Sequence, residues 1–126
     1  MELAHPGVVY EDENIKAEYI PTMHMPHSYS ILITEGETRV LFGGDFSAWL
    51  AAADVPKVTE EEIDLFVCEM AHFTAEQITL YLEKCRAKKL AFTHVYPIQK
   101  YDDIEKMKGK YRFSIITPND GDALEI

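Results

Sequence analysis

Apolar and polar positions alternate in the first third of the chain with the period of β-strands. Residues 15–20 form a strand-like run that stops at Pro21, and apolar side chains then recur at every second position from Tyr29 to Ile33. Glu35-Gly36-Glu37 has the composition of a turn, and residues 39–42 return as a second apolar arm. This part of the chain is therefore predicted to contain a β-hairpin.

The rest of the chain alternates between strand and helix patterns. The nearly continuous apolar run 64–68 predicts a strand covered on both faces. Thr74 and Gln77 form a capping box that opens a helix through about Ala87. Further elements are predicted at 90–93 (strand), 102–108 (helix), 111–117 (strand) and 120–122 (a tight turn before 123–126). Short strand–helix–strand connections imply a parallel portion of sheet with helices packed on it.

Two shorter segments are also expected to be helical. The Ala-rich stretch 46–53 predicts one or two helical turns that end before Pro56, and Thr59 is predicted to cap an acidic helix start. Four basic residues are expected to complement the dipole at the C-terminal end of the main helix: Lys84, Arg86, Lys88 and Lys89.

Composition narrows the class of protein. The 126 residues, 47% of them hydrophobic, predict one packed domain over residues 1–126. A net charge of −10 argues against a nucleic-acid partner and gives no reason to expect a membrane surface. No stretch has the character of a signal peptide or a membrane span, and Cys68 and Cys85 lie in apolar segments typical of reduced, buried thiols. A cytoplasmic location is the expectation.

Asp45 is the first candidate for chemistry. It follows Gly43 and Gly44 at the end of the apolar run 39–42, where the glycines allow a sharp turn and a close approach. The carboxylate can cap a helix that begins at Phe46, or it can bind a metal ion. The two roles are compatible.

Histidines at other element edges extend this candidate. His94 closes the predicted strand 90–93, and His24 and His27 share one loop with the His-x-x-His spacing of a chelating pair, which is common by chance. A histidine in such a position is more often only solvated or hydrogen-bonded. His24, Asp45 and His94 together are more specific, because each falls on what could be one rim of the sheet.

Glu69 and His72 follow the strand 64–68 and reach the same rim. His72 is either solvated beside the helix cap at Thr74, or a group that orients a metal-binding histidine. Trp49 and the methionines are expected to pack in the core or in loops rather than to form a binding site.

Several of these segments, in order, resemble the metallo-β-lactamase-fold hydrolases, and in particular the ribonuclease Z-like branch. The segment 28–45 with its Gly-Gly-Asp ending, the segment 64–72 with Glu69 and His72, Thr93-His94, and the closing 118–126 match motifs of that family. The resemblance implies the C-terminal half of an αββα sandwich: an α/β fold with a β-hairpin followed by β-α-β-α-β, a mixed sheet, and helices on one face.

The resemblance also implies a metal site, most commonly with zinc. It assigns the bridging ligand to Asp45, the late histidine ligand to His94 and the earlier one to His24, with His27 as the alternative. Asp45 and His72 are the expected catalytic residues. The family's His-x-His-x-Asp-His signature is not in this sequence. The sequence also departs from the family pattern at Cys68, a position that is often His in the ribonuclease Z-like branch.

Two functions follow as expectations. The first is a metal-dependent hydrolase acting on a small molecule or a phosphoester, incomplete or inactive as an isolated chain, with a complementary N-terminal half as its partner. The second is a non-catalytic half-domain that serves as an assembly or interaction module, because an uncovered apolar sheet face favours a homo-oligomer.

Overall fold

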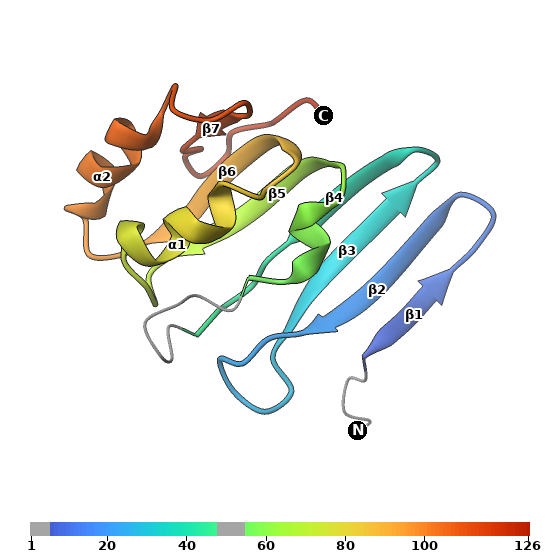
Figure 1. Ribbon diagram of the computed structural model, residues 1–126. Coiled ribbons are helices and arrows are strands. Elements are labelled where there is room, and N and C mark those ends of the chain that lie inside the picture. The colour runs from blue at the N-terminus through green and yellow to red at the C-terminus, as the bar shows by residue number, and fades with distance from the viewer. Residues whose placement is uncertain (1–5, 48–54) are drawn as a thin grey trace.

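The computed structural model describes residues 6–47 and 55–126, which form one mixed sheet with its strands in chain order (Figure 1). The strands are β1 (Gly7–Glu11), β2 (Ile15–Pro21), β3 (Tyr29–Glu35), β4 (Thr38–Phe42), β5 (Ile63–Met70), β6 (Ala87–Val95) and β7 (Ser114–Ile116). The helices are α1 (Ala75–Leu82) and α2 (Lys100–Met107), preceded by a short 3₁₀ helix, η2 (Lys57–Glu60).

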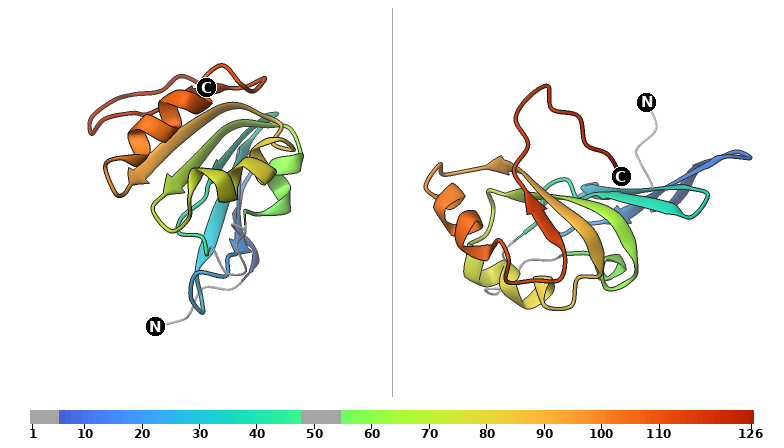
Figure 2. Two further views of the ribbon diagram at one scale, coloured as in Figure 1. Left: turned by 60° about the vertical axis from the view of Figure 1, so that its left-hand side comes forward. Right: turned by 90° about the horizontal axis from the view of Figure 1, so that it is seen from above.

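The sheet changes from antiparallel to parallel at its middle. Strands β1 to β4 pair antiparallel, and each pair from β4 to β7 is parallel. Helices α1 and α2 lie on the same face, and the C-terminal segment crosses on the other side (Figure 2). An α/β fold with a hairpin, a mixed sheet and helices on one face is therefore confirmed.

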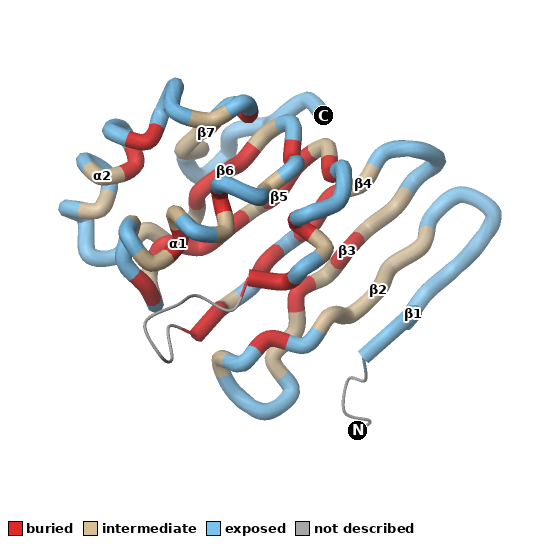
Figure 3. Tube along the Cα trace, viewed as in Figure 1, coloured by how far each residue is buried: buried red, intermediate tan, exposed pale blue. Residues whose placement is uncertain are grey.

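The core lies between this face of the sheet and the helices. Ile78 of α1 and Ile104 of α2 have no exposed surface, and they belong to one buried cluster with Leu41, Phe66 and Leu90 from the central strands. Burial decreases outward from β5 and β6, and β1 is exposed along its whole length (Figure 3). The best-packed strands are therefore the ones whose ends carry the candidate site.

The opposite face of the sheet carries a smaller apolar cluster formed by Val40, Leu65 and Ala91. Beside it is a groove of about 340 Å³, to which Leu124 and Ile126 of the C-terminal segment contribute. This face is thus partly covered by the chain itself. Self-association through it stays a prediction, which sedimentation at high protein concentration tests.

Several predicted boundaries were wrong because strand pairing decides them. Helix α1 ends at Leu82 rather than Ala87, because Ala87 already belongs to β6, where it pairs with Ile63 of β5. The predicted basic residues therefore lie outside the last turn of α1, and Lys88 pairs with Asp64 across the sheet instead. Strands β5 and β6 both extend beyond the predicted 64–68 and 90–93.

The weaker elements also differ from the prediction. Strand β1 was missed because it has no buried face, and β7 is shorter than the predicted 111–117. Thr59 does not cap a helix: it is buried within η2 and its hydroxyl donates to the carbonyl of Pro56. Residues 123–126 form no strand here. The predicted helix 46–53 and Trp49 fall mostly or wholly outside the described residues, and Phe46 and Ser47 are not helical.

The cysteine expectation holds for the most part. Both thiols are free; Cys68 is fully buried and Cys85 is partly buried. Burial raises the pKa of both thiols, in Cys68 well above its usual value. Within the described ranges, no helix is long and apolar enough to cross a membrane.

Asp64 gives the sheet a measurable dependence on pH. Its carboxylate accepts the backbone N–H of Arg39 (2.8 Å) and the ammonium of Lys88 (3.0 Å), and the Arg39 bond chiefly lowers the pKa of Asp64. A lowered folded-state pKa stabilises the protein above the unfolded pKa of about 3.9, and this contribution disappears as pH falls through the folded value.

We therefore expect Asp64→Asn to lower the free energy of unfolding by about 1 kcal/mol at pH 7. The difference from the unsubstituted chain should shrink below about pH 4. Urea unfolding at pH 7 and pH 3 measures both. Glu37→Gln, in the exposed β3–β4 turn, is the control; an equal effect there would contradict the role of Asp64.

Candidate metal centre

The Gly-Gly-Asp segment after β4 is fixed to its neighbours by hydrogen bonds. Gly43 donates its N–H to the carbonyl of Val67 in β5 (2.8 Å), and the hydroxyl of Ser30 donates to the Gly43 carbonyl (2.6 Å). The hydroxyl of Thr22 donates to the carbonyl of Asp45 (2.9 Å). Asp45 is therefore held at the end of β4 by residues from three separate segments.

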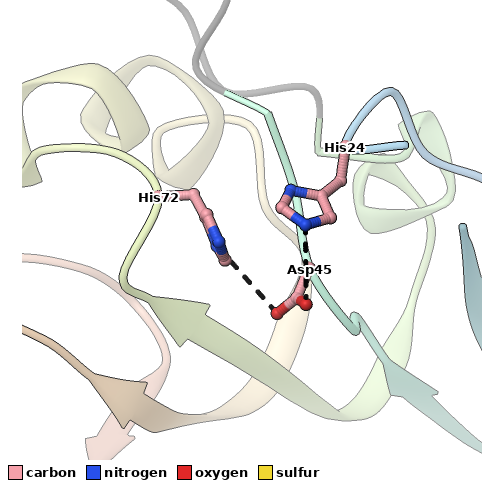
Figure 4. A group of neighbouring side chains, drawn as sticks. All are labelled: His24, Asp45 and His72. Carbon is pink, nitrogen blue, oxygen red and sulfur yellow. Dashed lines mark ion pairs between the residues drawn. The ribbon is translucent and has the colours of Figure 1, made fainter.

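Asp45 lies among three histidines that come from different parts of the sequence. His24 Nε2 is 3.8 Å from Asp45 Oδ2, and the two other contacts are to Oδ1: 3.9 Å from His72 Nδ1 and 3.5 Å from His94 Nδ1. His24 and His72 approach the carboxylate from separate segments (Figure 4). The structure thus brings together the three predicted ligands and His72.

These separations suit a shared cation better than direct hydrogen bonds. Two ligands of one tetrahedral zinc ion lie about 3.3 Å apart, given bonds of about 2.0–2.1 Å. His24, Asp45 and His72 each have a ligand atom within 4.8 Å of the others. Imidazole nitrogens and a carboxylate are donors that zinc accepts, so this set of residues fits a zinc ion.

His94 is the nearest histidine to the carboxylate, although the compact three-residue group contains His72 instead. The Nδ1 of His72 already lies 2.7 Å from Glu69 Oε1, which is a hydrogen-bond distance. This contact leaves Nε2 of His72 available, and metal-binding histidines commonly donate the N–H of their other ring nitrogen to a carboxylate, so the geometry keeps both His94 and His72 as candidate ligands. The two oxygens of Asp45 face different histidines, as a carboxylate that bridges two positions would.

Glu69 is a buried carboxylate that accepts hydrogen bonds from several residues around the site. Its side chain is only 3% exposed, and Oε1 accepts the backbone N–H of Phe46 (2.9 Å). Oε2 accepts the N–H groups of Ala71 (2.6 Å) and His72 (3.0 Å). Oε1 also contacts the His72 ring. This one carboxylate therefore binds both Phe46, the residue after Asp45, and the loop after β5.

The same contact fixes the orientation of the His72 ring. A carboxylate only accepts hydrogen bonds, so the Nδ1 of His72 donates to Glu69, and in the neutral ring Nε2 then carries the lone pair. The side chain of His72 is 32% exposed. His72 is therefore an oriented imidazole, not a freely solvated one.

The position of His94 depends on a β-bulge in β6. Glu69 pairs with Thr93 and Met70 pairs with Val95, so His94 is an extra residue in β6, with φ of +48°. Such a bulge redirects a side chain and is common beside functional sites. His94 also borders a cavity of about 630 Å³ that Thr93, Tyr101 and Asn119 help to line.

His27 lies apart from this cluster. It is exposed, has φ of +62°, and makes no ion pair or hydrogen bond with another residue of the described ranges. The geometry thus favours His24 over His27 as the loop ligand. A separate cavity of about 920 Å³ lies at the opposite end of β5 and β6, near Glu62, Arg86 and Lys88, and no member of the cluster lines it.

Sequence reasoning overlooked some of the supporting residues. Thr22 and Lys100 contact the site only through backbone carbonyls, so nothing in their local sequence marks them. The bulge at His94 depends on pairing with β5, which lies more than twenty residues earlier. The motif Cys68-Glu69-Met70-Ala71-His72 did mark Glu69, but not the number of its partners.

Comparison with known proteins gives structural matches only. No protein-family model and no curated protein matches the sequence. Among solved structures, the metallo-β-lactamase fold protein YhfI from Bacillus subtilis is 18% identical, with a TM-score of 0.72 over 97% of this chain and 53% of its own.

Two further structures agree. Human tRNase Z, short form, is 16% identical over 94% of this chain and 46% of its own, with a TM-score of 0.61. A diphosphatase from the PhnP family is 20% identical over 98% of this chain and 47% of its own, with a TM-score of 0.64. This chain spans about half the length of each of these neighbours. Together with the mixed sheet described above, these matches show that the chain has the fold of one half of a metallo-β-lactamase domain.

Proposed function

We propose that this chain supplies the metal-binding edge of a zinc-dependent hydrolase of the metallo-β-lactamase superfamily. The observation that carries the proposal is the convergence of three histidines on Asp45, which follows β4. His24 comes from the loop between β2 and β3, and His72 and His94 come from the ends of β5 and β6. Parallel strands present their end residues along one edge of a sheet, where α/β proteins commonly bind ligands. The fold neighbours, which include a tRNase Z and a diphosphatase, support the same reading.

In this proposal His24, Asp45 and His94 hold zinc. Three protein ligands with an open fourth position are the usual number for a catalytic zinc. When bound, zinc would lower the pKa of a coordinated water to about 7 and polarise a scissile phosphoryl or carbonyl group. A two-metal centre would need further ligands, and the neighbours have chains about twice as long in which such ligands could reside.

His72 is the proposed proton carrier beside these ligands. Glu69 fixes its Nδ1–H, so Nε2 is the ring nitrogen able to take or give a proton at the edge of the site. We propose phosphoesters as the substrate class, with support from the neighbours named tRNase Z and a diphosphatase.

The test is a zinc titration of the chain by calorimetry, beside the variant Asp45→Ala. We expect the unsubstituted chain to bind zinc and Asp45→Ala to weaken binding by more than about 100-fold. Loss of residues that only support a ligand already costs about 10–100-fold. Asp120→Ala, an exposed carboxylate outside the cluster, should leave the affinity unchanged.

Two results would contradict the assignment: no zinc bound by the unsubstituted chain, or equal affinity in Asp45→Ala. Hydrolysis of bis(p-nitrophenyl) phosphate by the zinc-loaded chain is a separate assay for the substrate class. Zinc binding without hydrolysis would keep the ligand assignment and reject phosphoester cleavage by this chain alone.

A further inference from the structure

The loop between β5 and α1 carries His72 and is held by one side chain from another element. Lys100 Nζ donates to the carbonyl of Ala71 (3.0 Å) and to the carbonyl of Phe73 (2.7 Å). These carbonyls belong to the two residues that flank His72. One ammonium group therefore binds the backbone on both sides of the oriented imidazole.

Lys100 belongs to the same chain segment as His94. It is the first residue of α2, six positions after His94, and the N–H of Tyr96 between them donates to the carbonyl of Met70 (3.3 Å). In addition to the pairing of β5 with β6, three hydrogen bonds thus join the segment that carries His94 to the loop that carries His72, and two of them come from Lys100. Beyond the end of the paired strands, Lys100 is the side chain that connects the two segments.

The surroundings of Lys100 suit a specific role. Its side chain is partly buried, which lowers its pKa, while attraction to Glu69 and then Asp103 acts in the opposite direction. Glu69 holds the ring and backbone N–H groups of His72, and Lys100 holds the neighbouring carbonyls. The loop is therefore bound on its donors by an anion and on its acceptors by a cation.

The simpler alternative is that Lys100 only stabilises the start of α2. A solvated lysine at that position would need no partner, and the two carbonyls would be satisfied by water. The convergence of both carbonyls on one ammonium, within reach of the Glu69 charge, favours the specific role.

We propose that Lys100 is a positioning residue of the metal centre, which fixes His72 relative to His94 by tying their two backbone segments together. The proposal rests on the function proposed above only for its consequence on metal binding. Its geometric content, the dependence of His72 on Lys100, concerns the metal-free chain and is tested there.

The first experiment uses NMR spectra of the histidine rings and backbone amides of the metal-free chain. Lys100→Met, which keeps the length but removes the donors, should shift or broaden the His72 ring signals. It should also speed amide exchange of Ala71 and His72 by about 10-fold or more, with the signals of Ile31 in β3 unchanged. Lys106→Met, the same substitution at an exposed position of α2, should change neither signal.

The second experiment measures zinc affinity. Lys100→Met should weaken zinc binding by about 10-fold, within the range for residues that support ligands, and Lys100→Arg should restore part of it. His72 lies beside two proposed ligands, 3.9 Å from the Asp45 carboxylate and with its ring centroid 4.3 Å from that of His24, so displacing it should disturb both. In a His72→Ala background, Lys100→Met should therefore have a smaller effect than in the unsubstituted chain.

The outcomes separate the two proposals. Unchanged His72 signals in Lys100→Met overturn the positioning role, whatever the zinc result, and so does an equal loss of zinc affinity with and without His72. Absence of zinc binding by the unsubstituted chain contradicts the proposed function, while the NMR comparison still decides the role of Lys100.

Discussion

Replacing Glu69 with alanine is expected to lower the free energy of unfolding by about 3 kcal/mol or more. The carboxylate accepts three backbone N–H groups, from Phe46, Ala71 and His72, besides the His72 ring. A buried donor left without a partner costs about 1–3 kcal/mol. Urea unfolding at pH 7 measures the loss, and the His72 ring should also lose its fixed orientation.

Glu69→Gln keeps the size of the side chain but removes its charge and one of its two acceptor oxygens, so it measures their contribution separately. Glutamine has one oxygen, so two of the four donors would face an amide NH₂, and the loss of stability should be intermediate. Glu76→Ala, on the exposed side of α1, should change stability by less than about 0.5 kcal/mol. If Glu69→Ala were as mild as Glu76→Ala, the carboxylate would not organise the site.

Gly44→Ala is expected to cost about 3 kcal/mol and to displace Asp45. Gly44 has φ of +68°, and a Cβ there would lie 2.9 Å from the backbone oxygen of Tyr29. The left-handed conformation alone costs a non-glycine residue about 1–2 kcal/mol, and the clash with backbone adds to it. Urea unfolding and a zinc titration should both register the change.

Gly36→Ala is the matched control for this substitution. Gly36 also has a positive φ, +59°, but a Cβ there would meet nothing within 4 Å. It should therefore show only the conformational cost, about 1 kcal/mol, and should leave zinc affinity unchanged. Equal effects at the two glycines would mean that close approach to Tyr29 does not hold the Asp45 segment.

Local signals in the sequence explain the parts of the fold that were predicted well. Strand β5 is apolar almost throughout because it is covered on both faces, and the capping box of α1 forms between Thr74 and Gln77 as expected. The turn at Gly36 sets the hairpin of β3 and β4. Each of these features depends on residues close together in the chain.

The features that were missed depend on partners distant in sequence. The end of α1 is decided by the pairing of Ala87 with Ile63, and the bulge at His94 by the register of β6 against β5. The expectation that Asp45, His24 and His94 share one rim came from strand ends alone. It left out Lys100, which acts through carbonyl groups that every residue possesses.

The order of strands in the sheet has a consequence for how the chain folds. Each strand pairs with its neighbour in sequence. The antiparallel strands β1 to β4 can therefore pair one after another, because the short loops between them cost little closure entropy. Strands β5 and β6 can join only after longer crossings. Asp45, Glu69 and His94 lie at the ends of strands on both sides of that step. The ligands of a metal ion would therefore come together only in a nearly completed fold. Such an ion would stabilise the folded state and would not direct the early steps of folding.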